Sequence, residues 1–331
     1  DRGSVLDEYS FPQPSAAGRD GGPRGASSAG RVSRPTPATP GGRAYLALRA
    51  RARSDGRPTD ELLVLYVLER FLYRVSVSDH RERLVLKGGM LLAAFEDRRP
   101  TADVDLLARS IANEVETISD VVRQILALPL DDGVTFDAGS LRAEVIRDAE
   151  LYSGVRIVVP ASIDRARHPL RIDINVGDPV TPAPVEVEYP ALLEEPFALL
   201  GYPLATVLAE KIVTMIDRGD TTTRDRDFAD VYVLTGRHRI VAAELAAAIA
   251  STGAHRGSDL RPIRQVLVEL GRLRQGDWSR FVARSGLVDA VPPVLADTIT
   301  AVANFADPIL TGEVVDGGWD PAARRWDSSD N

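Results

Sequence analysis

The chain has 331 residues, and its 48 acidic and 40 basic side chains give a net charge of −8. It has no cysteine, which excludes disulfides, thiolate metal sites and a cysteine nucleophile, and which is typical of a cytoplasmic protein. The four histidines lack metal-ligand spacing and no apolar run approaches the roughly 20 residues that span a bilayer, so the composition disfavours a zinc enzyme and a membrane protein.

Charge is distributed unevenly along the chain. Residues 1–57 carry ten arginines against five acids, which gives this end +5 and the remainder −13. Because phosphate binding depends on clustered cations, a nucleic-acid substrate would need a local basic patch on this acidic body. Residues 1–43 are rich in Gly, Ser, Pro, Ala and Arg and show no hydrophobic periodicity, so we expect a disordered N-terminal tail.

Residues 44–190 are expected to form an α/β domain. Thr59 is a plausible N-cap for a helix with a clear apolar face, which is followed by a strand, a glycine turn and a second helix through Phe95. The remaining pattern predicts strands at 84–86, 102–108, 141–147, 154–160 and 170–176, and a helix at 111–128.

Beyond Tyr202 the pattern is almost entirely helical. We expect residues 191–312 to form a helical domain that contributes to the active site, with helices at about 204–218, 224–235, 239–252, 259–273, 277–285 and 291–305. Residues 313–331 are expected to be a flexible C-terminal tail, although Trp319 and Trp326 could dock onto the body.

Lysine is rare in this chain and therefore informative. Lys87 and Lys211 are its two lysines, and the other 38 basic residues are arginines. A lysine ammonium can contact a phosphate as a compact point charge, which the planar guanidinium of arginine cannot imitate. Both lysines are therefore candidate nucleotide contacts, and the alternative is that each is an ordinary surface lysine.

Three aspartates occupy positions suited to a metal site. Asp103 and Asp105 are two residues apart in a predicted strand and share one face, while Asp173 lies in the middle of a second strand that otherwise alternates apolar residues. Like charges side by side are costly unless a cation offsets them, and Mg²⁺ prefers such hard oxygen ligands. Upstream, Gly88 and Gly89 have no side chains and would let backbone N–H groups approach a triphosphate at a helix start.

This ordered set resembles the nucleotidyltransferase fold of the DNA polymerase β superfamily, with its glycine turn, DxD strand and later third aspartate. More narrowly, KGGMLL with RRPTADVDL, then RIDINVGDP, EKIVTMIDRGD and RDRDFADVYVL resemble the four successive motifs of the AbiEii/MenT nucleotidyltransferase toxins over about residues 59–310. The resemblance implies an α+β fold in which a polymerase β-like domain with a mixed sheet precedes an α-helical domain.

The same resemblance implies a function and a set of site residues. It implies a Mg²⁺-dependent toxin of a toxin–antitoxin system that transfers NMP from an NTP to the 3′ acceptor end of tRNA, which would stop aminoacylation, translation and growth. Its partners would be the NTP, the tRNA and a cognate antitoxin, with no membrane. The motifs assign two Mg²⁺ ions to Asp103, Asp105 and Asp173, catalytic roles to these three with Lys211 and Asp230, and nucleotide contacts to Lys87, Gly88, Gly89, Arg99, Thr101, Lys211 and Asp227.

Some of these residues have structural explanations. Asp227 and Asp230 share a helix face, so salt bridges to Arg218, Arg224 or Arg226 could explain them. Arg171, beside Asp173, could bind phosphate or merely neutralise the carboxylates. His168 and His238 are interpreted as surface or hinge residues.

Two other functions also remain open. The acceptor could be a small-molecule or protein hydroxyl, which the acidic body favours, or the chain could be a non-catalytic interaction protein on a nucleotidyltransferase scaffold. A tRNA acceptor requires a basic groove leading to Asp105. The arginines expected to build it are Arg98, Arg99, Arg218, Arg224 and Arg226.

Overall fold

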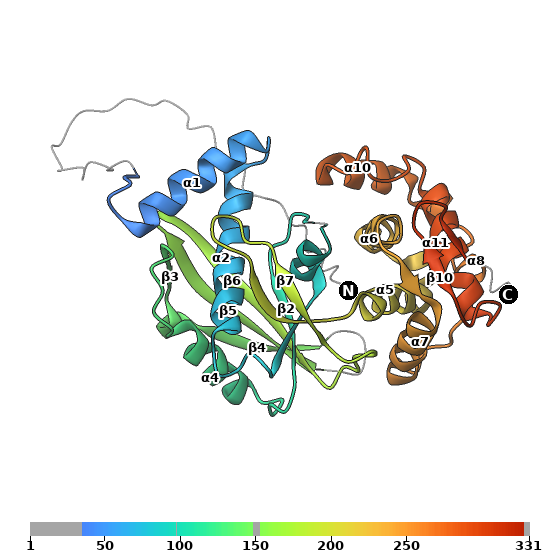
Figure 1. Ribbon diagram of the computed structural model, residues 1–331, viewed down its shortest axis with the longest axis horizontal. Coiled ribbons are helices and arrows are strands. Elements are labelled where there is room, and N and C mark those ends of the chain that lie inside the picture. Colours follow the sequence, from blue (N-terminus) through green and yellow to red (C-terminus); the bar gives the residue numbers. More distant parts are fainter. Residues whose placement is uncertain (1–34, 97, 148–152, 328–331) are drawn as a thin grey trace, which may run out of the picture. The chain divides into compact units, whose positions relative to one another are not determined.

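Eight strands form one mixed sheet in the computed structural model, which describes residues 35–96, 98–147 and 153–327 (Figure 1). The strand order is β3-β5-β6-β2-β1-β8-β7, and β4 also pairs with β5. The β1/β8 and β2/β6 pairs are parallel and the others are antiparallel, so the mixed sheet of the expected α+β fold is confirmed. The strands are β1 (Leu84–Lys87), β2 (Val104–Ala108), β3 (Val134–Phe136), β4 (Arg142–Arg147), β5 (Ser153–Ile163), β6 (Ala166–Val176), β7 (Val185–Tyr189) and β8 (Phe197–Gly201).

One face of the sheet is apolar and covered by helices. Helix α2 (Thr59–Ser76) packs on β5 and β6, and α4 (Val115–Leu126) lies beside it (Figure 1). Leu170, Ile172 and Ile174 of β6 are completely or almost completely buried. Because side chains alternate along a strand, the polar residues between them, including Asp173, lie on the opposite face. The packed face therefore fixes which side of the sheet can carry a polar site.

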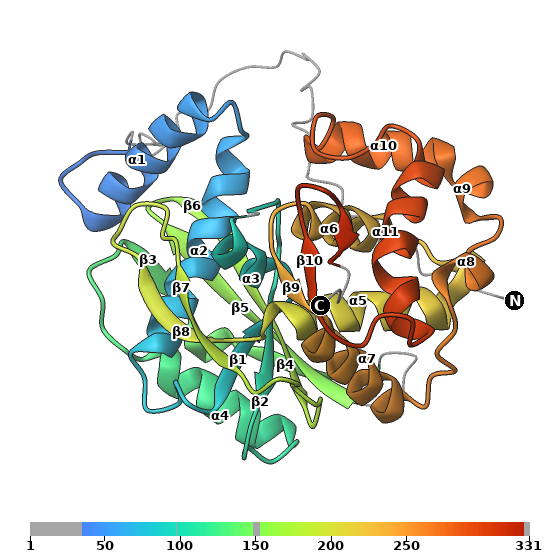
Figure 2. The same cartoon turned by 45° about the vertical axis from the view of Figure 1, so that its right-hand side comes forward.

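The chain after the sheet is mainly helical, as expected (Figure 2). Within the described residues no helix is long and apolar enough to cross a membrane. The elements not yet given are α1 (Pro40–Ser54), α3 (Gly88–Leu91), η1 (Leu92–Phe95), η2 (Ala138–Ser140), α5 (Leu204–Arg218), η3 (Gly219–Thr221), α6 (Asp225–Thr235), β9 (Ile240–Val241), α7 (Ala242–Arg256), α8 (Ile263–Val266), α9 (Leu270–Leu273), α10 (Gln275–Ser285), α11 (Leu295–Leu310), β10 (Gly318–Asp320) and β11 (Arg325–Trp326).

The N-terminal helices begin at different points from those expected. Helix α1 starts at Pro40, inside the range 1–43 predicted as a disordered tail; residues 1–34 of that range lie outside the described residues. The Thr39 side chain accepts a hydrogen bond from the Gly42 amide at 3.1 Å, and a proline at the first helical position fits without loss of a hydrogen bond. Thr59 is the first residue of α2 and not its N-cap, which is Pro58.

Two interruptions explain other differences. The single helix expected over 259–273 is broken into α8 and α9, because the Asp220 carboxylate accepts hydrogen bonds from the amides of Glu269 and Leu270 at 3.1 and 2.9 Å. The sheet also continues past the expected limit near residue 190: β8 pairs in parallel with β1, with Gly201 opposite Leu86. Strand β8 is a short apolar segment after a proline-containing turn, so its sequence shows little periodicity from which a strand could be predicted.

The C-terminal segment is ordered up to residue 327, where a flexible tail had been expected from residue 313. Trp319 is 1% exposed, and its indole N–H donates to the Thr235 carbonyl at 2.7 Å. Trp326 stacks on Phe305, with ring centroids 5.4 Å apart, and donates to the Phe305 carbonyl at 2.9 Å. These contacts support the alternative that the two tryptophans dock, because burying an indole contributes a large apolar area.

Candidate active site

The glycine turn after β1 brings Asp105 against the backbone. Gly88 has a positive φ of 64°, and a Cβ at this position would lie 1.9 Å from Asp105 Oδ2. A Cβ at Gly89 would lie 2.9 Å from Thr101 Oγ1 and 3.4 Å from a terminal nitrogen of Arg99. Glycine is therefore required at both positions, because the segment from Arg99 to Asp105 packs directly against the backbone of the turn. The helix that follows is a single turn, α3, continued as the 3₁₀ helix η1, so its dipole is small.

A row of charged residues crosses four neighbouring strands on the polar face of the sheet. Lys87 on β1 is paired in register with Asp105 on β2, Asp105 with Asp173 on β6, and Asp173 with Arg156 on β5. Residues directly opposite each other in a sheet point to the same face. The row therefore reads cation, carboxylate, carboxylate, cation. Asp103 immediately precedes β2, so the expected Asp103/Asp105 pair lies at the beginning of that strand.

Burial and mutual repulsion disfavour ionisation of Asp103 and Asp105. The pKa of Asp105 is raised to about 7, first by burial and then by the charge of Asp103, while Lys87 lowers it. The pKa of Asp103 is also raised, first by burial and then by Asp173, and Arg226 lowers it. The protein's own cations thus do not fully offset the negative charge at this position.

Asp173 differs because it has a close cationic partner. Arg156 Nε donates to Asp173 Oδ1 at 2.8 Å and Arg156 Nη2 donates to Oδ2 at 2.7 Å, so the guanidinium holds both carboxylate oxygens. Within the described part of the chain, no three carboxylate or imidazole groups are arranged as a ready set of metal ligands. The chemistry of Asp103 and Asp105 fits a hard divalent cation, since both are oxygen donors whose charge is incompletely offset. Asp173 can join them only against competition from Arg156, whose guanidinium already engages both carboxylate oxygens.

Lys87 lies in a buried ion-pair cluster. Its Nζ donates to Asp178 Oδ2 at 2.7 Å and to Glu210 Oε1 at 3.2 Å, and it lies 5.3 Å from the ring centroid of Tyr202. Burial alone would lower the pKa of Lys87, but Glu210, Tyr202 and Asp178 raise it well above its ordinary value. Lys87 is therefore charged at neutral pH and is not an ordinary surface lysine.

Lys211 forms a second cluster with the two aspartates of α6. Its Nζ donates to Asp227 Oδ1 at 2.9 Å and to Asp230 Oδ2 at 2.7 Å, and both aspartates are buried. Arg99 Nη2 also donates to Asp230, at 3.3 Å. Burial opposes ionisation of Asp227, but Lys211 lowers its pKa below the ordinary value. Lys211 and Arg99 are thus direct ion-pair partners of this helix face. Of the arginines that had been considered, Arg224 and Arg226 also lower the pKa of Asp227.

The expected basic groove is only partly supported. Arg98 points away from Asp105: it donates to the Pro190 carbonyl, lies 5.4 Å from the Tyr189 ring centroid and approaches Glu69 at 3.6 Å. Arg99 is turned toward Asp230. Arg224 and Arg226 are exposed at the beginning of α6. Arg218 is half-buried at the end of α5. Of the five expected arginines, Arg226 and Arg99 act on the metal-site candidates, since both lower the pKa of Asp103.

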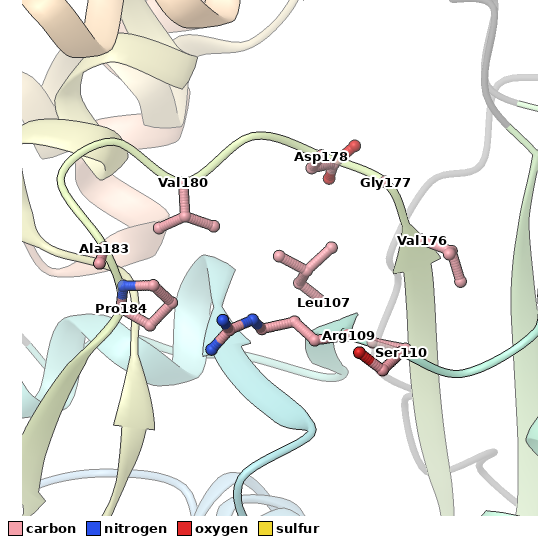
Figure 3. Close-up of a pocket in the computed structure, with 10 residues that line it drawn as sticks. Leu107, Arg109, Ser110, Val176, Gly177, Asp178, Val180, Ala183 and Pro184 are labelled. Carbon is pink, nitrogen blue, oxygen red and sulfur yellow. The ribbon is translucent and has the colours of Figure 1, made fainter.

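A pocket of about 400 Å³ lies under the segment that connects β6 and β7 (Figure 3). Leu107 and Arg109 lie beneath this segment, and Asp178 lies on it (Figure 3). The three candidate metal aspartates do not line this pocket. It touches the site only through Asp178, whose carboxylate holds Lys87.

The structure brings the predicted residues into two neighbouring groups, one around Asp105 and one around Lys211, with Arg99 and Thr101 beside Gly89. It adds three partners that were not predicted: Arg156, Asp178 and Glu210. Of these, Arg156 had a detectable signal. A two-residue turn at Asp164 and Arg165 would set the β5–β6 register and place it opposite Asp173.

One protein family matches more than half of this chain. Residues 70–297 match the family described as nucleotidyl transferase AbiEii toxin, type IV toxin–antitoxin system. Among solved structures, JHP933 from Helicobacter pylori is 13% identical with a TM-score of 0.48, over 76% of this chain and 93% of that chain. A candidate nucleotidyltransferase from H. pylori is 13% identical with a TM-score of 0.43, over 76% and 96% of the two chains. No curated protein matches the sequence.

Proposed function

Because the chain belongs to the AbiEii family of nucleotidyltransferase toxins, we propose that it transfers a nucleoside monophosphate from an NTP to the 3′ acceptor end of tRNA in a Mg²⁺-dependent reaction. A modified acceptor end cannot be aminoacylated, so translation would stop. Family membership also implies an NTP donor and a cognate antitoxin. The observation that carries the proposal is the buried Lys87–Asp105–Asp173 row beside a glycine turn.

Asp103 and Asp105 would hold Mg²⁺, with Asp173 as the third carboxylate. When bound, Mg²⁺ lowers the pKa of an attacking hydroxyl and offsets charge developing on the transferred phosphate. Asp105 fits this role because it is buried and its oxygen lies directly against the Gly88 backbone, which fixes its position. A fixed ligand loses little freedom on binding the cation.

The two lysines would contact the triphosphate without leaving their clusters. A lysine ammonium has three N–H donors. Lys87 uses two of them on Asp178 and Glu210, and Lys211 uses two on Asp227 and Asp230. We propose that the third N–H of each lysine meets a phosphate oxygen. The carboxylates then keep each ammonium charged and hold it in one position, whereas the side chain of a solvent-exposed lysine would be free to move.

The test is to incubate the purified protein with total tRNA, Mg²⁺ and each α-labelled NTP in turn, beside the isosteric variant Asp105→Asn. We expect label to enter tRNA with the wild type and not with the variant. Transfer by Asp105→Asn at the wild-type rate would refute the assignment of Asp105.

The second candidate function has the same chemistry and a different acceptor, a small-molecule or protein hydroxyl. The observation that favours it is the orientation of Arg98, which removes one arginine from the expected tRNA groove on an already acidic body. If the protein binds Mg²⁺ and NTP but labels no tRNA, this acceptor class replaces tRNA. Label would then appear in protein or small-molecule fractions of a cell extract.

A further inference from the structure

The bidentate ion pair between Arg156 and Asp173 sits where the third metal-binding carboxylate is needed. Both oxygens of Asp173 accept from the guanidinium, at 2.8 and 2.7 Å. The Asp173 side chain is 13% exposed and the Arg156 side chain 38% exposed, so the pair lies at the border between the buried row and solvent. Arg156 is thus the more solvent-accessible member of the pair.

A guanidinium and a divalent cation compete for the same carboxylate. Both bind along the oxygen lone pairs, and a bidentate arginine occupies the two oxygens in parallel. Asp105 and Asp103, by contrast, have raised pKa values, so their charge is not offset to the same degree. A cation entering the site would therefore meet Asp103 and Asp105 directly and would compete with Arg156 for Asp173.

We propose that Arg156 is a displaceable counter-ion of Asp173 that lowers the affinity of the empty site for a divalent cation and moves to a substrate phosphate when the nucleotide binds. The proposal rests on the proposed function for the identity of that ligand. Guanidinium pairs with phosphate as well as with carboxylate, so the released side chain gains an equivalent partner. Cation binding and triphosphate binding would then support each other, because each draws one member of the pair away from the other.

The experiment measures Mn²⁺ binding by calorimetry in the absence of nucleotide, so it does not depend on activity. Arg156→Gln should bind Mn²⁺ about tenfold more tightly than the wild type, since one charge-assisted bidentate pair no longer has to be broken. Arg171→Gln is the matched control. Arg171 is exposed and lies two residues from Asp173 on the same face of β6. Its replacement by glutamine removes the same charge as Arg156→Gln. It should change Mn²⁺ affinity less than about twofold, because a screened charge without a direct contact contributes little.

In an Asp173→Asn background the effect of Arg156→Gln should disappear, because the contact under test is gone. Arg156→Lys, which keeps the charge without the bidentate geometry, should give an intermediate affinity and serves as the test if Arg156→Gln does not fold. Unchanged or weaker Mn²⁺ binding by the Arg156 variants would overturn the inference, and so would an equal gain in Arg171→Gln or no Mn²⁺ binding by any variant. The proposed function is judged separately, by label transfer to tRNA.

Discussion

Replacing Gly88 by alanine should lower the rate of nucleotide transfer far more than its effect on the free energy of unfolding would explain. The new Cβ would lie 1.9 Å from Asp105 Oδ2, 2.6 Å from its Cγ and 2.8 Å from its Cβ. Rotation of the Asp105 side chain can relieve the contacts with Oδ2 and Cγ, but the contact with Cβ also requires a small shift of the backbone, so Asp105 must move away from the turn. Its displacement by about 1 Å should cost on the order of 10²-fold in the rate of nucleotide transfer.

Gly257→Ala is the matched control for the backbone. Gly257 has a φ of 66°, against 64° for Gly88, and a Cβ there would meet nothing within 4 Å. Both substitutions place an L-residue in the left-handed region, which costs about 1–2 kcal/mol. Only the change at Gly88 also moves a candidate metal ligand.

The assay pairs urea unfolding with label transfer at saturating NTP. Both variants should lose about 1–2 kcal/mol of unfolding free energy, while transfer falls sharply for Gly88→Ala and stays near wild type for Gly257→Ala. Transfer by Gly88→Ala within about threefold of wild type would refute the reasoning, since a displaced catalytic carboxylate must cost more than that. Equal loss of transfer in both variants would assign the effect to lost stability.

Three further substitutions test the packing and the ion pairs. Lys211→Met should destabilise the fold by about 3 kcal/mol in urea unfolding, because it leaves buried carboxylates without their ammonium; a loss below about 0.5 kcal/mol would mean that solvent already offsets these charges. Trp319→Ala should lower the free energy of unfolding by about 3–5 kcal/mol. An unchanged urea midpoint would mean that the C-terminal segment does not stabilise the fold and is a flexible tail. Burial raises the pKa of Glu69 from 4.5 to about 7, so the folded protein holds a proton that the unfolded chain has released, and stability falls by up to about 3 kcal/mol as pH rises through that interval. Glu69→Gln should flatten this slope between pH 4.5 and about pH 7, and a slope that persists unchanged would belong to other groups.

The parts of the fold that could be predicted are those with a strong period. Helix α5 was expected at residues 204–218 and ends there, because its apolar positions recur every three to four residues over four turns. Strands β4 and β6 were found from alternation. The strand β8 and the break between α8 and α9 could not be, since the first is set by pairing with β1 and the second by the Asp220 carboxylate, which lies about 50 residues away in sequence.

The candidate site shows the same limit at the level of side chains. The aspartates were identified from their spacing, because residues two apart in a strand must share a face. The ion-pair partners of the two lysines were not identified, since Asp178 and Glu210 meet Lys87 only after a loop and a helix fold over the sheet. The proposed phosphate contacts therefore came from the sequence, while the charges that hold them in place came from the structure.

The carboxylate partners of these cations bear on how a protein with a net charge of −8 could bind a triphosphate. Lys87, Arg99, Arg156 and Lys211 are each held by carboxylates, so a phosphate group would have to share these cations with them. Seven carboxylates surround these four cations, with Arg224 and Arg226 at the start of α6 as the further cations that lower the pKa of Asp227. The seven are Asp103, Asp105, Asp173, Asp178, Glu210, Asp227 and Asp230. A triphosphate would be repelled by such a set unless divalent cations enter with it. This charge balance is the physical reason for the proposed Mg²⁺ dependence, and the internal ion pairs would keep the lysines and arginines positioned for the proposed contacts with phosphate oxygens.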